Sequence, residues 1–499
     1  MIDTLAVNKI DTKKNPGNSL KQIIEDNWDE IFLFDAFHEK HLTYGDFFKK
    51  SIYLKNELEK RGIKKGDFLC LILDNSVELA MMYLSSLFLG TIVIPIDPFR
   101  GKNEIKEILG QFENKKIISD KKFNNEFKSS IMLEEIKKFE NGTDFDNLEV
   151  FSKINYDDPF LITFTSGTSG KQKGVIHSFN NLFLSANAFK KKFDFGKKNI
   201  FLHNLPMNYM AGILNLLILP LVSESKVIIS ERSMISNISK FWNIVIKYSA
   251  NSFWLIPTIL ELLIKLDRGL DGIEYVKNNE LTICVGTSPL TITTKENFEN
   301  KYNVQVFESY GLSETLFVST NYPNNDKSSS VGKFLEEVTF KFFDDELGIK
   351  TPWMFLGYYD LDEKNFFNDD YYLTGDLGMF KDDLLFITGR KKDIIIKGGI
   401  NISPRKIEDI LNKSQLFSEI TIIGFPSRLL GEKIVCFGIK NQEIKENEKK
   451  SINKEIVEQL GMNYSIDEFI FVKEIPKNLN GKINKVKIQQ IFEKQINDS

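Results

Sequence analysis

The chain has 499 residues, of which 42% are hydrophobic and 27% charged, and its formal net charge is −4. This is a globular composition, and the length predicts a large domain with at least one smaller one. Because there is no basic excess to neutralise phosphates, the composition argues against nucleic acid as the main partner.

Short apolar runs alternate with segments of helical periodicity along the chain. Residues 67–73 (DFLCLIL) predict a strand, and residues 76–88 predict the helix that follows it. Apolar strands alternating with helices predict α/β layers with mostly parallel sheets covered on both faces. Further strands, each followed by a turn and a helical segment, are predicted at residues 91–96, 226–229, 252–256 and 281–285.

No segment predicts a membrane span. The longest apolar run, residues 211–222, is too short to cross a bilayer and contains Pro220, so we expect it in the core. The three cysteines, Cys70, Cys284 and Cys436, show no metal-binding or disulfide spacing, and we expect buried thiols. Together these features predict a cytoplasmic protein, in a compartment where ATP is available.

The predicted secondary-structure pattern changes near Gly389. Residues 331–385 are rich in turns and predict a small β-barrel-like region, whereas a compact strand, helix and strand pattern follows. We therefore expect an N-terminal domain at 1–390 and an α+β C-terminal domain at 391–499.

A loop rich in glycine, hydroxyl groups and lysine follows the apolar run 160–164 and reads T-S-G-T-S-G-K-Q-K-G. Glycine lets backbone N–H groups approach a polyphosphate, the hydroxyls add donors and the lysines offset negative charge. It is not a Walker loop, because Gln172 follows the first lysine where a hydroxyl is required. We predict a phosphate-binding loop made of Thr165, Ser166, Gly167, Thr168, Ser169, Gly170, Lys171, Lys173 and Gly174.

This loop resembles the phosphate-binding signature of the acyl-adenylate-forming superfamily, which includes acyl-CoA synthetases, adenylation domains of nonribosomal peptide synthetases and luciferases. The family's other motifs have counterparts in the same order, so the resemblance covers nearly the whole chain. They are found at residues 42–47, 62–78, 90–98, 286–290 (G-T-S-P-L), 309–314 (S-Y-G-L-S-E), 374–376 (T-G-D), 389–399 (G-R-K-K-D-I-I-I-K-G-G) and 476–483 (P-K-N-L-N-G-K-I).

The resemblance implies a two-step ligase. ATP and a carboxylic acid would form an acyl-AMP with release of pyrophosphate, and the acyl group would pass to a thiol. The thiol would belong to CoA or to the phosphopantetheine of an acyl carrier protein acting in trans.

The resemblance also implies roles for single residues. Tyr310 would stack on the adenine, Asp376 would accept bonds from the ribose hydroxyls, and Arg390 would reach the same nucleotide. Glu314 would hold Mg²⁺ together with phosphate oxygens, and Thr168 would assist catalysis. The remaining nucleotide-binding residues would be Gly286, Thr287, Ser288, Pro289, Glu308, Ser309, Gly311 and Ser313.

The C-terminal domain is implied to be mobile and to serve both steps. Lys482 would stabilise the charge that develops as the carboxylate attacks the α-phosphate. The domain would then turn about a hinge at Lys392, so that Gly398 and Gly399 border the tunnel through which the thiol enters.

The acyl pocket is the least defined site. The resemblance places it at Met207, Tyr209, Met210, Gly212, Trp254, Gly286 and Glu308. Tyr209 stands where many acyl- and aryl-CoA synthetases carry a histidine, and we expect His177 and His203 to be structural. Residues 203–213 contain no carboxylate to pair with a substrate ammonium, which favours an uncharged acid of small or medium size.

Three alternatives stay open at this point. An amino-acid adenylating ligase that loads a separate carrier protein is possible if Glu308 supplies the missing charge. A nucleotide-binding pseudoenzyme is disfavoured, because the catalytic motifs are retained. A luciferase-like oxygenase could use the same fold, since a fold does not determine a function.

Overall fold

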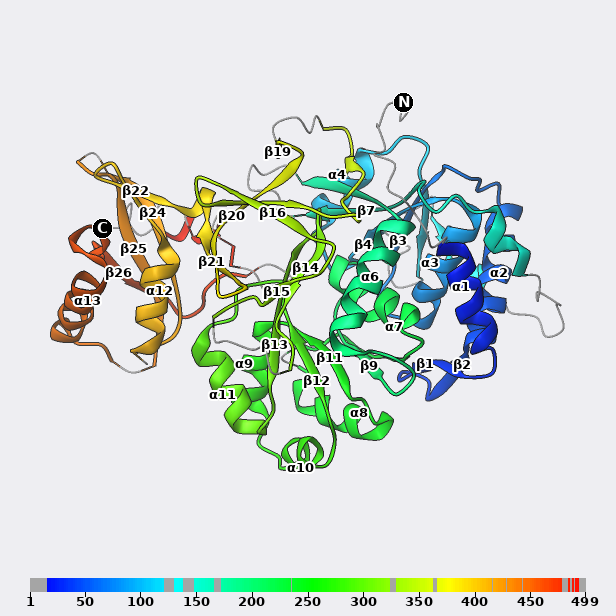
Figure 1. Cartoon of the computed structure of the whole chain (residues 1–499), viewed down its shortest axis with the longest axis horizontal. Helices are drawn as coiled ribbons and strands as arrows, with labels where there is room; N and C mark the ends of the chain where they lie inside the picture. Colours follow the sequence, from blue (N-terminus) through cyan, green and yellow to red (C-terminus); the bar gives the residue numbers. More distant parts are fainter. Residues whose placement is uncertain are drawn as a thin grey trace.

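The computed structural model describes most of the chain (Figure 1). The residues that it describes are 16–120, 130–137, 148–165, 172–234, 236–323, 329–361, 366–414, 416–427, 429–441, 443–477, 483–484, 487–488 and 490–492.

One sheet of the N-terminal part has seven strands in the order β18-β8-β7-β4-β3-β5-β6. The strands from β7 to β6 run parallel, and β8 and β18 are added antiparallel at one edge. The strands are β3 (Phe68–Ile72), β4 (Ile92–Ile96), β5 (Lys116–Ser119), β6 (Ile131–Met132), β7 (Pro159–Thr165), β8 (Lys173–Ser178) and β18 (Gly357–Tyr358).

A second sheet has nine strands in the order β15-β14-β13-β12-β11-β9-β10-β1-β2. Its central strands are parallel, from β1 to β13, and antiparallel strands close both edges. The strands are β1 (Ile31–Asp35), β2 (Lys40–Thr43), β9 (Ile200–His203), β10 (Lys226–Ile229), β11 (Ser252–Leu255), β12 (Thr282–Val285), β13 (Val306–Leu312), β14 (Leu316–Thr320) and β15 (Lys333–Phe334).

Helices cover these sheets and their ends follow local chemistry. Helix α3, for example, begins where the Ser76 hydroxyl accepts the N–H of Leu79 and ends at Gly90, which has a φ of 74°. The helices are α1 (Pro16–Asp26), α2 (Tyr44–Lys60), α3 (Val77–Leu89), α4 (Lys102–Gly110), α5 (Leu133–Ile136), α6 (Phe179–Phe193), α7 (Leu219–Val222), α8 (Phe241–Tyr248), α9 (Pro257–Leu266), α10 (Asp271–Asn278) and α11 (Ile292–Tyr302).

Strand β3 shows that a parallel sheet is buried on both faces. Leu69 and Leu71 belong to the largest apolar core, whereas Cys70 and Ile72 belong to a second core that includes residues of α4. Successive side chains of a strand point to opposite faces, so both faces are covered. The predicted layered α/β fold with mostly parallel sheets is confirmed.

Two other expectations about the core are confirmed. The apolar run 211–222 forms a buried π-helical segment, Ala211–Ile218, followed by α7. All three cysteines are buried and free. No helix among the described residues has the length and apolarity that a membrane crossing requires.

A third, antiparallel sheet follows the two large ones in the chain. Its strands β16, β17, β20 and β19 pair in that order, and β21 pairs with β20. This sheet is the region for which the sequence predicts a β-barrel-like structure. The strands are β16 (Thr339–Phe343), β17 (Glu346–Lys350), β19 (Phe367–Asn368), β20 (Tyr371–Lys381) and β21 (Leu384–Arg390).

The C-terminal residues build a sheet of their own with separate apolar cores. This part lies at one end of the molecule in Figure 1, beyond β20 and β21. The division at residue 390 stays a prediction. The elements are β22 (Ile395–Lys397), β23 (Ile400–Ile402), α12 (Pro404–Lys413), β24 (Phe417–Ser427), β25 (Gly431–Lys440), α13 (Glu446–Leu460) and β26 (Glu468–Phe471).

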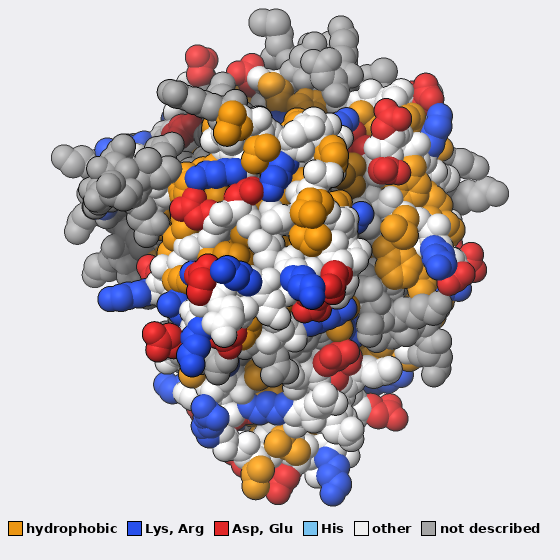
Figure 2. All heavy atoms as spheres, turned by 90° about the vertical axis from the view of Figure 1, so that its left-hand side faces the viewer, with side chains coloured by type: hydrophobic (Ala, Val, Ile, Leu, Met, Phe, Trp, Pro, Cys, Tyr) orange, Lys and Arg blue, Asp and Glu red, His pale blue; other side chains and the backbone are white. Residues whose placement is uncertain are grey.

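Figure 2 views the molecule from this C-terminal end. On the described part of this face, basic and acidic side chains are interspersed with apolar ones. The C-terminal part therefore presents a surface of mixed charge to the solvent on this side.

The parallel strands of each large sheet end at a common edge, and the loops that follow them meet there. Residues of three predicted site segments lie at such strand ends: 203–212 at the end of β9, 254–257 at the end of β11, and 286–290 after β12. Residues 230–232, which the sequence did not single out, follow β10 in the same way. The fold thus gathers segments that are far apart in the sequence.

Candidate functional site

Asp376 is the centre of a buried ionic arrangement. The hydroxyl of Tyr310 donates to Asp376 Oδ2 over 2.7 Å, and Arg390 Nε lies 2.7 Å from Asp376 Oδ1. Asp376 and Arg390 are register partners on β20 and β21, whereas Tyr310 comes from β13. The structure thus brings together three of the predicted nucleotide-binding residues.

Burial and the neighbouring Asp376 carboxylate raise the pKa of Tyr310 well above its ordinary value. Tyr310 therefore stays protonated and acts as the donor in this pair. Each carboxylate oxygen has a second lone pair, so Asp376 can accept further hydroxyl groups without giving up either partner.

A tight turn orients the Asp376 carboxylate. The hydroxyl of Thr374 accepts the Asp376 N–H, and Gly375 has a φ of 72°, which favours glycine. The Gly375 N–H donates to Glu346, which also pairs with Lys391 over 2.8 Å. The T-G-D motif therefore makes the turn that fixes its own acidic side chain.

Glu314 is buried in the turn between β13 and β14. Its Oε1 accepts a hydrogen bond of 2.7 Å from the hydroxyl of Tyr358, and the Tyr358 and Tyr372 hydroxyls lie 2.8 Å apart. The Nζ of Lys173 lies 5.1 Å from the centroid of the Tyr358 ring. Burial lowers the pKa of Lys173, and the Glu314 charge opposes that shift.

The β7–β8 hairpin flanks the predicted phosphate-binding loop. Thr165 and Lys173 are register partners at the loop end of the hairpin, next to Gly174. A Cβ at Gly174 would lie 2.9 Å from Ile162, so the strands require glycine there. The other predicted loop residues, Ser166, Gly167, Thr168, Ser169, Gly170 and Lys171, lie outside the described residues.

Two buried polar atoms at the ends of β11 and β12 have no hydrogen-bond partner among the described residues, namely Trp254 Nε1 and Thr287 Oγ1. Gly286 lies between them: a Cβ there would be 3.0 Å from Ser309 O and 3.5 Å from Trp254 Nε1. Thr287 also has a φ of 72°, a strained value for threonine. Unpaired buried groups and local strain are typical of a ligand site.

The predicted acyl-pocket segment turns sharply between β9 and the π-helical segment. A Cβ at Gly212 would lie 2.0 Å from Pro206 O, so this turn requires glycine. His203 donates from Nε2 to Gly212 O over 2.9 Å, because a carbonyl oxygen can only accept. Met207 and Met210 are buried, and Tyr209 is partly buried.

His177 and His203 are both fully buried, and each donates to a backbone carbonyl. His177 reaches Ser313 O over 2.6 Å, next to Glu314. Burial lowers the pKa of each histidine to about 4. Both are therefore neutral hydrogen-bond donors, as expected for structural histidines.

These pKa values predict acid sensitivity. Below the unfolded pKa of about 6.5, the unfolded chain binds protons that the folded chain excludes, so stability falls between about pH 6.5 and pH 4. At pH 5, one such histidine lowers the free energy of unfolding by about 2 kcal/mol relative to neutral pH. His203→Gln keeps a donor but removes the titration. We expect its melting temperature to fall less than that of the unsubstituted protein between pH 7.5 and pH 5; identical profiles would contradict this.

The C-terminal site residues make contacts within their own sheet. Gly398 and Gly399 form the turn between β22 and β23, both at positive φ, and the Gly398 N–H donates to Leu430 O. Lys392 lies in an exposed 3₁₀ turn, Lys391–Asp393, directly after β21. Lys482 lies outside the described residues.

The sequence missed several residues that hold this region together. Tyr358 and Tyr372 contact Glu314 from other strands, and no motif marks them. Asn208 and Arg232 form part of a buried polar cluster. Asn75 and Asp97 belong to the same cluster. Both lie in segments that resemble family motifs, 62–78 and 90–98, which was the one sequence feature that could have drawn attention to the cluster.

Family models match most of the chain. A model described as AMP-binding enzyme matches residues 21–359, and a model described as AMP-binding enzyme C-terminal domain matches residues 406–482.

Relatives with assigned names are CoA ligases. The chain is 27% identical to 4-coumarate–CoA ligase-like 6 of Arabidopsis thaliana over 474 residues, which cover 86% of the chain and 82% of the relative. It is 26% identical to the 2-succinylbenzoate–CoA ligase of Listeria monocytogenes over 465 residues, covering 91% and 95%.

Solved structures share the fold. ATP-bound MatB from Rhodopseudomonas palustris superposes with a TM-score of 0.82 at 22% identity, covering 95% of this chain and 99% of that one. MenE from Bacillus subtilis in complex with the acyl-adenylate OSB-AMP gives a TM-score of 0.82 at 21% identity, covering 95% and 98%.

Proposed function

The chain belongs to the AMP-binding enzyme family, and from that premise we propose that it is an AMP-forming ligase for a small or medium-sized carboxylic acid. In the first step the acid attacks the α-phosphorus of ATP, giving an acyl-AMP and pyrophosphate. In the second step the thiol of CoA attacks the acyl carbonyl, and AMP leaves.

The observation that carries this proposal is the arrangement around Asp376. Tyr310 and Arg390 hold its carboxylate in one orientation, so its remaining lone pairs can accept the two hydroxyls of a ribose. The Tyr310 ring then lies beside that sugar, where stacking on a base is favourable. In this proposal Asp376 binds the nucleotide through the ribose hydroxyls, in addition to its ion pair with Arg390.

The residues fit a magnesium ion carried in with ATP. Magnesium at such sites is held by one or two carboxylates together with phosphate oxygens and water. Among the described residues, no group of three or more His, Cys, Asp or Glu side chains could hold a metal ion. Glu314 supplies one carboxylate, which the hydroxyl of Tyr358 orients through a bond to Oε1. A magnesium ion held there would offset negative charge on the phosphate oxygens, and Lys173 adds a positive charge beside Glu314.

The acid binds beside Gly286, between the end of β11 and the 205–212 segment. The apolar side chains of Met207, Met210 and Trp254 favour an uncharged acyl group. Trp254 Nε1 and Thr287 Oγ1 are the groups that orient its polar end, since both lack partners among the described residues.

A second candidate substrate class is an amino acid. Glu308 is a buried carboxylate next to Ser309 in the predicted pocket wall, and a carboxylate there could pair with a substrate ammonium. An amino-acid ligase would load the phosphopantetheine of a separate carrier protein. Turnover with amino acids alone, lost in Glu308→Gln, would favour this class over the first.

The names of the two relatives, a CoA ligase and a CoA ligase-like protein, favour CoA as the acceptor. A carrier protein in trans is the alternative acceptor. A cytoplasmic location completes the proposal, because ATP and CoA are both available there and the three cysteines are unpaired.

The hinge predicts that the two steps can be separated. Lys392→Pro restricts the backbone where the C-terminal domain must turn, and it restricts Lys391 as well. We expect thioester formation to fall at least about tenfold more than adenylation. Lys392→Ala is the control and should affect neither step. Equal losses in the two half-reactions of Lys392→Pro would contradict a hinge here.

The proposed function is tested by a pyrophosphate-release screen over fatty, aryl, hydroxy and amino acids, with and without CoA. We expect release with one class of uncharged acid and an acyl-CoA product only when CoA is present. If none of these acids gives pyrophosphate release, the proposal is refuted.

A further inference from the structure

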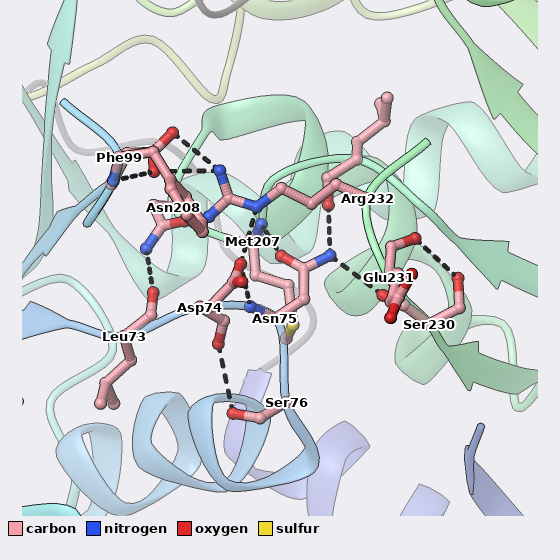
Figure 3. Close-up of polar contacts among 12 residues, drawn as sticks. Leu73, Asp74, Asn75, Ser76, Phe99, Met207, Asn208, Ser230, Glu231 and Arg232 are labelled. Carbon is pink, nitrogen blue, oxygen red and sulfur yellow. Dashed lines mark hydrogen bonds and ion pairs between the residues drawn. The ribbon is translucent and has the colours of Figure 1, made fainter. Parts of the chain in front are cut away.

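We propose that Asn75, Asp97, Asn208 and Arg232 form a polar clamp that positions the segment 205–212, one wall of the proposed acyl pocket. Figure 3 shows Asn75, Asn208 and Arg232 directed toward one another around Met207. The four residues lie in the loops that follow β3, β4, β9 and β10. The effect on the substrate rests on the proposed function, whereas the effect on the segment rests on geometry alone.

Asn75 binds the backbone of the segment on both sides of Pro206. Its Nδ2 donates to Leu205 O over 2.8 Å, and its Oδ1 accepts the Met207 N–H over 2.8 Å. The hydroxyl of Tyr83 donates to Met207 O over 2.7 Å. A buried backbone without neighbouring strands needs such partners, and here two side chains supply them.

Asn208 ties the segment to the seven-stranded sheet. Its Nδ2 donates to Leu73 O over 2.7 Å and to Ile96 O over 3.1 Å, at the ends of two neighbouring strands. Its Oδ1 accepts a bond of 3.0 Å from Arg232 Nη2. This single buried side chain therefore joins both large sheets.

Arg232 locks Asn208 in that orientation. Its Nη1 lies 2.9 Å from both oxygens of Asp97, and its Nε lies 2.8 Å from Asp74 Oδ1. The guanidinium lies 5.0 Å from the centroid of the Phe99 ring. Only 11% of the Arg232 side chain is exposed.

The charge balance shows that Arg232 positions the segment rather than binding the substrate. Two carboxylates, Asp74 and Asp97, face one guanidinium, so the cluster has no positive charge left for an anionic acid. Nη1 and Nη2 donate to Asp97 and Asn208 instead, whereas Nε lies 2.8 Å from Asp74 Oδ1 without a hydrogen bond to the described residues. Met207 and Tyr209, which flank Asn208, are the residues that the clamp sets against the acyl group.

Kinetics of two variants test the clamp. Asn208→Leu keeps the branched shape of the side chain but removes its hydrogen bonds, and it leaves Arg232 paired with Asp97. Arg232→Ala releases Asn208 instead. We expect each variant to raise the KM for the acid at least about tenfold, with the KM for ATP changed less than about twofold. In the double variant, the rise in the KM for the acid should be smaller than the product of the rises in the two single variants, because each single variant already breaks the bond between Arg232 and Asn208.

Asn199→Ala is the matched control. Asn199 is also buried, but its amide bonds to Gly196 and Ser252 at the opposite end of β9. A similar rise in the KM for the acid in this control, or an equal rise in the KM for ATP in the clamp variants, would overturn the proposal.

Hydrogen exchange tests the clamp without activity. We expect peptides covering 205–212 to exchange at least about tenfold faster in Asn208→Leu and Arg232→Ala than in the unsubstituted protein, with 252–255 unchanged. Unchanged exchange in 205–212 would overturn the clamp. If the unsubstituted protein ligates no acid, the proposed function fails, and the exchange result alone decides the clamp.

Discussion

Replacing Lys482 with alanine is expected to slow acyl-adenylate formation about a hundredfold or more while ATP binding is nearly unchanged. The attack joins two anions and builds negative charge at the α-phosphorus. An ammonium placed against this charge stabilises the transition state more than the bound substrates. Pyrophosphate release measures the rate, and calorimetric titration with ATP measures the binding.

Lys473→Ala is the control for this prediction, because Lys473 is an exposed lysine that follows β26 in the C-terminal part of the chain. It should release pyrophosphate at the normal rate. Acyl transfer from a chemically synthesised acyl-AMP to CoA should survive in Lys482→Ala, since that step needs no attack on phosphorus. Near-normal pyrophosphate release from Lys482→Ala would contradict the assignment.

Asp376→Ala is expected to abolish most ATP binding. The substitution removes the acceptor for the ribose and leaves Arg390 and the Tyr310 hydroxyl without the carboxylate that they share. A hydrogen bond to a charged group contributes about 1.5–3 kcal/mol, so loss of the two bonds to the ribose hydroxyls is expected to weaken ATP binding about a hundredfold or more. The cost in folding stability is smaller than for a fully buried pair, because the Arg390 side chain is 41% exposed. Calorimetric titration with ATP, together with the melting temperature, measures both consequences.

Asp376→Asn separates the two roles, because the amide preserves the shape and one acceptor while removing the charge. We expect it to bind ATP more weakly than the unsubstituted protein and to melt closer to it than Asp376→Ala does. Asp369→Asn removes an exposed carboxylate that pairs with Lys341, and it should change neither quantity. Normal ATP affinity in Asp376→Ala would remove the observation on which the proposed function rests.

The strands were predictable because each carries a local signal. The run 67–73 is almost wholly apolar, and a parallel strand buried on both faces must be so. The prediction for 226–229 agrees with β10, and that for 252–256 differs from β11 by one residue. Glycine motifs were equally informative, because Gly174, Gly212 and Gly375 stand where a Cβ would collide or a positive φ is needed.

The partners of the site residues were not predictable, because each pair depends on how the sheets pack. Tyr358 is 44 residues from Glu314, and Arg232 is 135 residues from Asp97. A lone tyrosine or arginine carries no periodicity and no motif. The sequence therefore predicts groups for the chemistry, a prediction that the experiments above test, whereas the residues that contact and orient these groups became visible only in the folded chain.

Isotope transfer tests the central claim, that the acid is activated as an acyl-AMP. The acid that gives turnover is labelled with ¹⁸O in its carboxylate and incubated with the protein, ATP and CoA. Attack of a carboxylate oxygen on the α-phosphorus, followed by thiol attack at the carbonyl, leaves one labelled oxygen in the released AMP. Mass spectrometry is predicted to find that label in AMP and none in pyrophosphate; unlabelled AMP, or ADP with labelled phosphate, would contradict the account.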